Sequence, residues 1–281
     1  MSDLACSFAS LQANEPLAGT AVESIDRWLL LEVTDTWAPK VLQSEVFSDA
    51  VRARLTEWSE APRSRLQLIR RPGRTAKRPL FAVMSSSGES RQVELDSYAD
   101  LVSLDLDMMQ LAPSEPTVLV CVHGRRDRCC AQHGAAVYRS LQSRVGDVWQ
   151  TSHLGGHRFA ACVLTLPNGL MYGRLRPEHG DAFAAAQYAG EVGDLDLFRG
   201  RCDFDRPTQA AEIFVRRRTG DRAVDALEWI ETTPDGDSTW TARFRASSGE
   251  EIARVRREET GIMRPASCGG EAEAVTQFVE L

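Results

Sequence analysis

The sequence of 281 residues has no long hydrophobic run, few aromatic residues and almost no lysine. No stretch approaches the roughly 20 apolar residues that a membrane-spanning helix needs, so we expect no membrane segment. The first residues lack a basic start followed by an apolar run, so we expect no signal peptide and a cytoplasmic protein. The formal net charge of −7 argues against a general nucleic-acid binder.

A convincing G-x-G-x-x-G motif is also missing, so we expect no flavin or nicotinamide domain. The sequence contains seven cysteines, which is an odd number in a chain of this length. This count does not suggest a secreted disulfide scaffold. In a reducing compartment, clustered cysteine and histidine more often indicate metal or redox chemistry. With 43% apolar and 26% charged residues, the chain should be globular, and it is long enough for two domains.

Four side chains that can bind metal lie in two short motifs. Cys121 and Cys130 belong to C-V-H-G-R-R-D-R-C-C, and His153 and His157 belong to S-H-L-G-G-H. Two thiolates and two imidazoles can hold a zinc ion or an iron–sulfur cluster. If the two pairs converge, the protein handles metal, and electron transfer is the expected use.

The spacing of the two cysteines does not by itself decide between zinc and an iron–sulfur cluster. Cys-x8-Cys is too wide for the short cysteine knuckle of common zinc sites, whereas so long a loop can wrap a [2Fe–2S] core. Cys130 is expected in the first turn of a helix, where the helix dipole favours the thiolate. Cys129 is adjacent and is the alternative ligand. A thiol redox enzyme built on Cys129 and Cys130 is disfavoured, because adjacent cysteines lack the C-x-x-C geometry.

Around these motifs the pattern predicts an alternation of strands and helices. The expected elements are a strand at 117–123, a helix at 128–144, a strand at 147–152, a hairpin across Pro167-Asn168-Gly169 and a helix at 177–191. Asp127 is the expected N-cap of the first helix. This order is typical of a thioredoxin-like layer of sheet and helices, and it places both ligand pairs on loops at one end.

The chain as a whole is predicted to be α/β in three parts. The N-terminal α/β domain, at 1–112, carries expected strands at 28–33, 65–71, 78–84 and 91–95 and helices at 45–58 and 97–104. It is either a degenerate, ligand-free thioredoxin-like repeat or an unrelated α/β cap. The thioredoxin-like ferredoxin domain covers 113–200. The C-terminal α+β extension, at 201–281, carries expected helices at 207–218 and 222–231 and a hairpin of 239–246 with 251–258. No element is assigned to the tail.

The two motifs together resemble the sucrase/ferredoxin-like family, whose core is a thioredoxin-like ferredoxin. Supporting segments are E-P-L-A-G-T-A at 15–21, L-I-R-R-P-G-R at 68–74, L-P-N-G-L-M-Y-G-R-L at 166–175 and S-C-G at 267–269. The resemblance implies a [2Fe–2S] cluster held by Cys121, Cys130, His153 and His157, and it favours Cys130 over Cys129. Thioredoxin-like ferredoxins usually use four cysteines, and the histidine pair matches this family's variant.

The implied function is electron transfer or redox sensing with an unknown redox partner protein, a reductase or an acceptor. Replacing two thiolates by neutral imidazoles raises the reduction potential. The second nitrogen of each imidazole could couple electron uptake to proton uptake. The alternative is a zinc-stabilised binding module without redox activity. An electron carrier is expected rather than a stand-alone enzyme, and sucrase activity is not supported, because the sequence singles out no pair of carboxylates for sugar hydrolysis.

Several neighbours are expected to surround the ligands. His123 lies two residues after Cys121 and so points the same way on a strand, where it either supports the site or merely packs. The other expected neighbours are Arg126, Gly155, Gly156 and Arg158. The glycines let backbone approach an inorganic core, and the arginines either stabilise a reduced cluster or are solvated surface. The sequence gives no role to Cys6 or Cys268.

Overall fold

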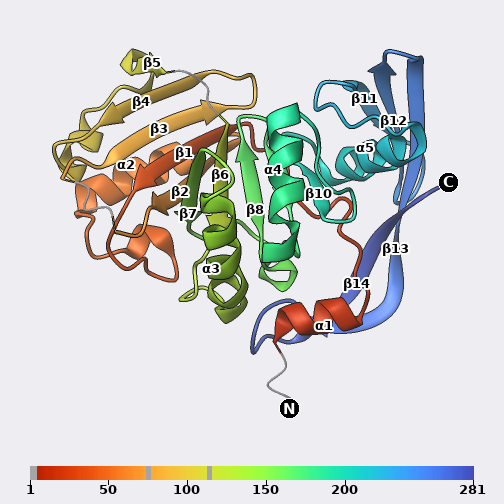
Figure 1. Cartoon of the computed structure of the whole chain (residues 1–281), viewed down its shortest axis with the longest axis horizontal. Coiled ribbons are helices and arrows are strands. Elements are labelled where there is room, and N and C mark those ends of the chain that lie inside the picture. Colours follow the sequence, from red (N-terminus) through yellow and green to blue (C-terminus); the bar gives the residue numbers. More distant parts are fainter. Residues whose placement is uncertain (1–4, 74–76, 113–115) are drawn as a thin grey trace.

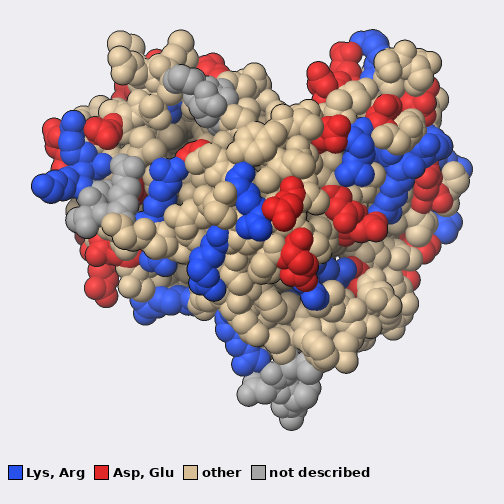
Figure 2. All heavy atoms as spheres, in the orientation of Figure 1, with Lys and Arg blue, Asp and Glu red and all other residues tan. Residues whose placement is uncertain are grey.

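The computed structural model describes residues 5–73, 77–112 and 116–281, which form a mixed α/β protein with two sheets (Figure 1). The expected α/β class is therefore confirmed. Residue 74 of the L-I-R-R-P-G-R segment and the predicted boundary at 113 lie outside the described residues. Among the described residues, no helix has the length and apolar character to cross a membrane. Figure 2 shows basic and acidic side chains interspersed over the face that it presents.

The first half of the larger sheet is a β-α-β-β-β unit closed by a short helix. Its elements are β1 (Arg27–Glu32), α2 (Asp49–Glu60), β2 (Ser64–Arg70), β3 (Leu80–Ser85), β4 (Ser90–Glu94) and η2 (Tyr98–Val102). Strand β1 is parallel to β2 and antiparallel to β3, and β3 is antiparallel to β4. Ser48 begins α2 by accepting a hydrogen bond from the Val51 amide.

The second half has the same order and the same pairing. Its elements are β6 (Thr117–Cys121), α3 (Arg128–Gln142), β7 (Asp147–Thr151), β8 (Val163–Leu166), β9 (Leu170–Tyr172), η5 (Pro177–His179) and α4 (Gly180–Ala189). Strand β6 is parallel to β7 and antiparallel to β8, and β8 is antiparallel to β9. The elements expected between 117 and 191 are thus present, with ends displaced by a few residues.

The two halves join edge to edge through an antiparallel contact of β2 with β7, where Ile69 faces Thr151. The resulting order is β10-β9-β8-β6-β7-β2-β1-β3-β4-β5. The N-terminal half therefore repeats the strand pairing of the second half, but the sequence from 27 to 112 contains no cysteine or histidine. Because the sheet is continuous across both halves, the three-part domain division stays a prediction.

Several elements differ from the sequence expectations. The helix expected at 222–231 is wrong, because Glu228–Pro234 forms β11 and pairs with β12 (Thr239–Ala246). The unassigned tail completes a long hairpin of β13 (Gly249–Pro265) and β14 (Ala272–Glu280). Elements not expected at all are α1 (Cys6–Gln12), β5 (Gln110–Ala112), β10 (Phe198–Arg201) and the short helices η1 (Val41–Gln43), η3 (Leu106–Met108) and η4 (His157–Phe159).

The small sheet, in the order β11-β12-β13-β14, packs against α5 (Arg206–Thr219). Asp205 begins α5 as N-cap by accepting a hydrogen bond from the Thr208 amide. From this sheet the β13–β14 hairpin runs along the side of the molecule to α1 (Figure 1). Helix α1, near the N-terminus, and the loop between β13 and β14 are thereby brought to the same region as the first turn of α3, whereas the C-terminus lies at the far end of β14 (Figure 1).

Candidate metal centre

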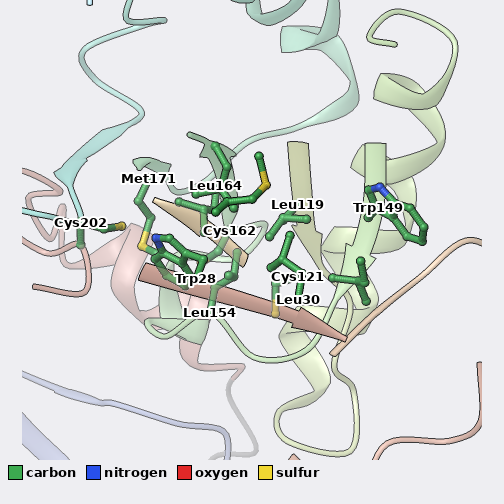
Figure 3. Packing of buried hydrophobic residues seen from close by; sticks show 14 of the residues in the cluster. Trp28, Leu30, Leu119, Cys121, Trp149, Leu154, Cys162, Leu164, Met171 and Cys202 are labelled. Atoms are coloured by element: carbon green, nitrogen blue, oxygen red, sulfur yellow. The ribbon is translucent and has the colours of Figure 1, made fainter. Parts of the chain in front are cut away.

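The site is built where β6 ends and α3 begins. The run T-V-L-V-C is buried throughout, as its apolar, β-branched composition requires. Cys121 ends this strand, is 1% exposed and belongs to the same core cluster as Trp28 and Leu119 (Figure 3). Helix α3 lies close against the strand because residue 134 is glycine, where a Cβ would overlap the carbonyl oxygen of Cys121. This close approach brings the first turn of α3 to the end of β6.

Cys121, Cys130 and His153 converge at this point. One ligand atom from each lies within 4.8 Å of the others, and Cys130 Sγ is 3.8 Å from Nδ1 of His153. The pKa of Cys121 is lowered well below its ordinary value, chiefly because Cys130 donates a hydrogen bond to it, and His153 adds to the effect. The pKa of Cys130 is raised, first by that same hydrogen bond and then by burial. Cys121 is therefore the more acidic thiol of the pair.

His157, the fourth predicted ligand, lies beside this group on η4. Its ring centroid is 5.0 Å from that of His153. Its Nε2 is 3.9 Å from Oδ2 of Asp127, while its Nδ1 is buried and has no hydrogen-bond partner among the described residues. Burial lowers the pKa of His157, which favours the neutral imidazole that binds metal.

The loop between the two histidines is held in a backbone conformation that favours glycine. Gly155 and Gly156 have φ values of 101° and 70°. A Cβ on Gly156 would collide with the guanidinium of Arg199, a buried residue of β10 that donates to the carbonyl oxygens of Gly155 (3.0 Å) and Thr20. The loop is thus fixed by β10 and by the 15–21 segment, and no local sequence signal identifies Arg199.

The expected neighbours occupy varied positions. His123 is buried edge-to-face against Trp37, with ring centroids 5.8 Å apart, and its ring nitrogens have no hydrogen-bond partner among the described residues. Arg158 forms an ion pair with the buried Glu15 (2.8 Å). Arg126 lines a surface cavity of about 640 Å³ to which His157 also contributes. The roles predicted for these residues stay predictions.

Asp127 was expected only as a helix cap, but its carboxylate also contacts Cys268 and lies near His157. Its Oδ1 accepts a hydrogen bond from the Cys129 amide at 2.9 Å, which confirms the cap. Its other oxygen accepts from the Cys268 amide at 2.9 Å and faces His157. Burial alone would raise the pKa of Asp127, but the hydrogen bonds from these two amides outweigh it and the pKa is lowered. An anionic carboxylate therefore lies beside the imidazole.

Cys129 points away from this group. Its Sγ lies 3.3 Å from Sγ of Cys268 and 3.6 Å from Sγ of Cys6. The two adjacent cysteines of α3 therefore face different sets of side chains: Cys130 is next to Cys121 and His153, whereas Cys129 is next to Cys6 of α1 and Cys268 of the β13–β14 loop. The preference for Cys130 as the ligand stays a prediction.

Comparison with known proteins gives one family and two solved structures. The family model described as sucrase/ferredoxin-like matches residues 17–200. The solved structures are cysteine-to-serine variants of a thioredoxin-like [2Fe-2S] ferredoxin from Aquifex aeolicus. Each is 18% identical, covers 31% of this chain and 100% of its own, and has a TM-score of 0.28. A search of curated proteins found no match. The family match confirms the resemblance inferred from the sequence, and the chain belongs to the sucrase/ferredoxin-like family.

Proposed function

We propose that this protein is a [2Fe–2S] electron-transfer or redox-sensing protein whose cluster is held by Cys121, Cys130, His153 and His157. The observation that carries the proposal is the convergence of the first three side chains, with the fourth beside them. Membership of a family described as sucrase/ferredoxin-like supports the proposal. The repeated strand pairing is compatible with two thioredoxin-like units, of which only the second contains the four ligands.

The residues present fit such a group. Nδ1 of His157 is a buried nitrogen without a hydrogen-bond partner among the described residues, so its lone pair is available to a metal. The Asp127 carboxylate lies 3.9 Å from the opposite ring nitrogen, on the side where a metal-bound histidine usually has a carboxylate neighbour. When bound, the cluster supplies one-electron transfer.

The protein's own part is to shield the site on one side and open it on the other. Cys121 and Cys130 belong to the hydrophobic core, which keeps water from the thiolates. The His157 side chain is 16% exposed and lines the surface cavity together with Arg126 and Arg128. We therefore propose that the redox partner docks over this cavity, where the cluster comes nearest to the surface. Proton uptake by the imidazoles stays a prediction of the ligand chemistry.

The test is anaerobic purification from cells supplied with iron, followed by visible absorption and assays of iron and acid-labile sulfide. We expect a red-brown protein with two irons and two sulfides per chain. Cys121→Ser should abolish both, while Cys202→Ser, at a buried cysteine outside the site, should keep them. Colourless wild-type protein with zinc at these four ligands and no sulfide would instead establish the zinc-stabilised binding module.

A further inference from the structure

A second group of metal-binding side chains lies on the other side of the first turn of α3. Sγ of Cys6, Sγ of Cys129, Sγ of Cys268 and a carboxylate oxygen of Asp127 all lie within 4.8 Å of one another. They come from α1, from the start of α3 and from the loop between β13 and β14. We infer that these four residues form a structural zinc site, separate from the Cys121, Cys130, His153 and His157 group.

The spacing of the sulfurs is the first argument. The three Sγ–Sγ distances are 3.3, 3.6 and 3.7 Å. A tetrahedral zinc ion with Zn–S bonds of about 2.3 Å places its sulfur ligands roughly 3.8 Å apart. The three thiols therefore already form nearly the triangular face of such a tetrahedron. A disulfide would use two of the three and leave the third thiol beside a carboxylate.

The fourth position belongs to Asp127. Its Oδ1 is 3.3 Å from Sγ of Cys268 and 3.8 Å from Sγ of Cys6. Each carboxylate oxygen also accepts one backbone hydrogen bond, and its second lone pair remains for a metal. The three thiolates are soft ligands, so a set of three thiolates and one carboxylate suits zinc and not magnesium or calcium.

The residues around the site would stabilise the negative charge that the zinc complex carries. Binding Zn²⁺ releases three thiol protons to solvent and leaves a site of net charge −2. The site lies at the N-terminus of α3, where the helix dipole stabilises negative charge. The Ser7 hydroxyl donates to Sγ of Cys129 at 3.3 Å and is itself 3.2 Å from Nε2 of His133, an arrangement that supports a bound thiolate. Asp127 and Cys268 also line the surface cavity, which gives the ion an entry path.

Such a site has a clear structural purpose. Cys6 and Cys268 are separated by 262 positions in the chain, and Cys129 belongs to the helix between them. Helix α1 is only seven residues long, which is too short for a helix to be stable on its own. A zinc ion would fasten α1 and the tip of the β13–β14 hairpin to α3, closing two very long loops of the unfolded chain.

The experiment measures zinc, iron and sulfide in full-length protein made with both metals supplied and purified anaerobically. We expect one zinc per chain in addition to any iron, with three sulfur ligands and one oxygen ligand by X-ray absorption at the zinc edge. Cys6→Ala and Cys268→Ala should lose the zinc and keep the iron, whereas the control Cys202→Ala should keep both. Cys121→Ser should lose the iron and keep the zinc, so failure of either site is distinguishable from failure of the other.

Three results would overturn the inference: wild-type protein without zinc, zinc whose ligand shell contains two histidine nitrogens, or a disulfide or iron–sulfur group at these three cysteines. Because the alanine variants could fail to fold, the wild-type protein gives a second measurement. Cys6, Cys129 and Cys268 should resist alkylation until a chelator removes the zinc, and limited proteolysis should then cut near α1. Equal alkylation before and after chelation would contradict the inference.

Discussion

The carboxylate of Asp127 lies 3.9 Å from Nε2 of His157 on one side and 3.3 Å from Sγ of Cys268 on the other. One residue therefore touches both groups of metal-binding side chains. Because Cys129 and Cys130 are adjacent and face opposite groups, the first turn of α3 is the physical boundary between the two sites. The two groups are therefore close enough to interact electrostatically, and Asp127 is a charged residue close to both.

The first prediction concerns that shared charge. Asp127→Asn should raise the reduction potential of the cluster, because it removes a negative charge beside His157. The sign is the same whether or not zinc remains bound, since either outcome makes the region less negative. We expect a shift on the order of tens of millivolts, where about 59 mV is a tenfold change for a one-electron couple. Voltammetry measures it, with Asp181→Asn on α4 as control. An unchanged or lower potential would contradict the argument.

The second prediction separates the adjacent cysteines. Cys130→Ser should lose most of the iron, because its thiolate is one of two anions that anchor the cluster. Cys129→Ser should keep the iron, since its sulfur points toward Cys6 and Cys268. Iron and sulfide assays together with the visible spectrum decide between them. If Cys129→Ser bleaches the protein and Cys130→Ser does not, the assignment of the two side chains is reversed.

Local signals in the sequence predicted much of the part that carries the site. The Asn168-Gly169 turn, the Asp127 cap and the buried run ending at Cys121 each specify structure within a few residues, and all three are present. The helix expected at 222–231 is wrong because A-V-D-A-L-E-W-I suits a helix locally, while pairing with β12 decides the outcome.

Other features depend on contacts that no local pattern contains. Cys129 meets Cys6 and Cys268 across 123 and 139 positions of sequence, and Arg199 reaches the histidine loop across 44. The sequence marks the cysteines by residue type, but it contains no local signal for Arg199. It could not show that they meet, because only the folded β13–β14 hairpin and β10 bring them together.

The third prediction tests how closely α3 must approach β6. Gly134→Ala should lower the free energy of unfolding by about 1–3 kcal/mol, because the added methyl group meets the carbonyl oxygen of Cys121. Cluster content should fall as well, since the helix would move Cys130 away. Gly146→Ala is the matched control, because a Cβ there meets nothing within 4 Å. Its stability should stay within about 0.5 kcal/mol of wild type. Urea denaturation measures the free energy of unfolding of both variants.

The last prediction concerns the buried carboxylate that ties the 15–21 segment to the site. Glu15 is 2% exposed and accepts hydrogen bonds from Arg158 and Arg264. Burial alone would raise its pKa, but the hydrogen bonds from Arg264 and the charge of Arg158 lower it. At neutral pH, Glu15→Gln should cost about 3–5 kcal/mol, because it leaves buried guanidinium charge without its partner.

The acid dependence follows from the sign of that shift. A carboxyl whose pKa is lower in the folded state adds stability that is complete above its unfolded pKa of about 4.3 and is lost as the pH falls through the folded value. The stability gap between wild type and Glu15→Gln should therefore be constant from pH 7 to about 5 and narrow below it. Urea midpoints of the two proteins, treated identically at each pH, measure the gap, and Glu178→Gln, at an exposed ion pair, should show none. A gap that widened on acidification would mean that Glu15 is protonated in the folded protein and does not hold the two arginines by charge.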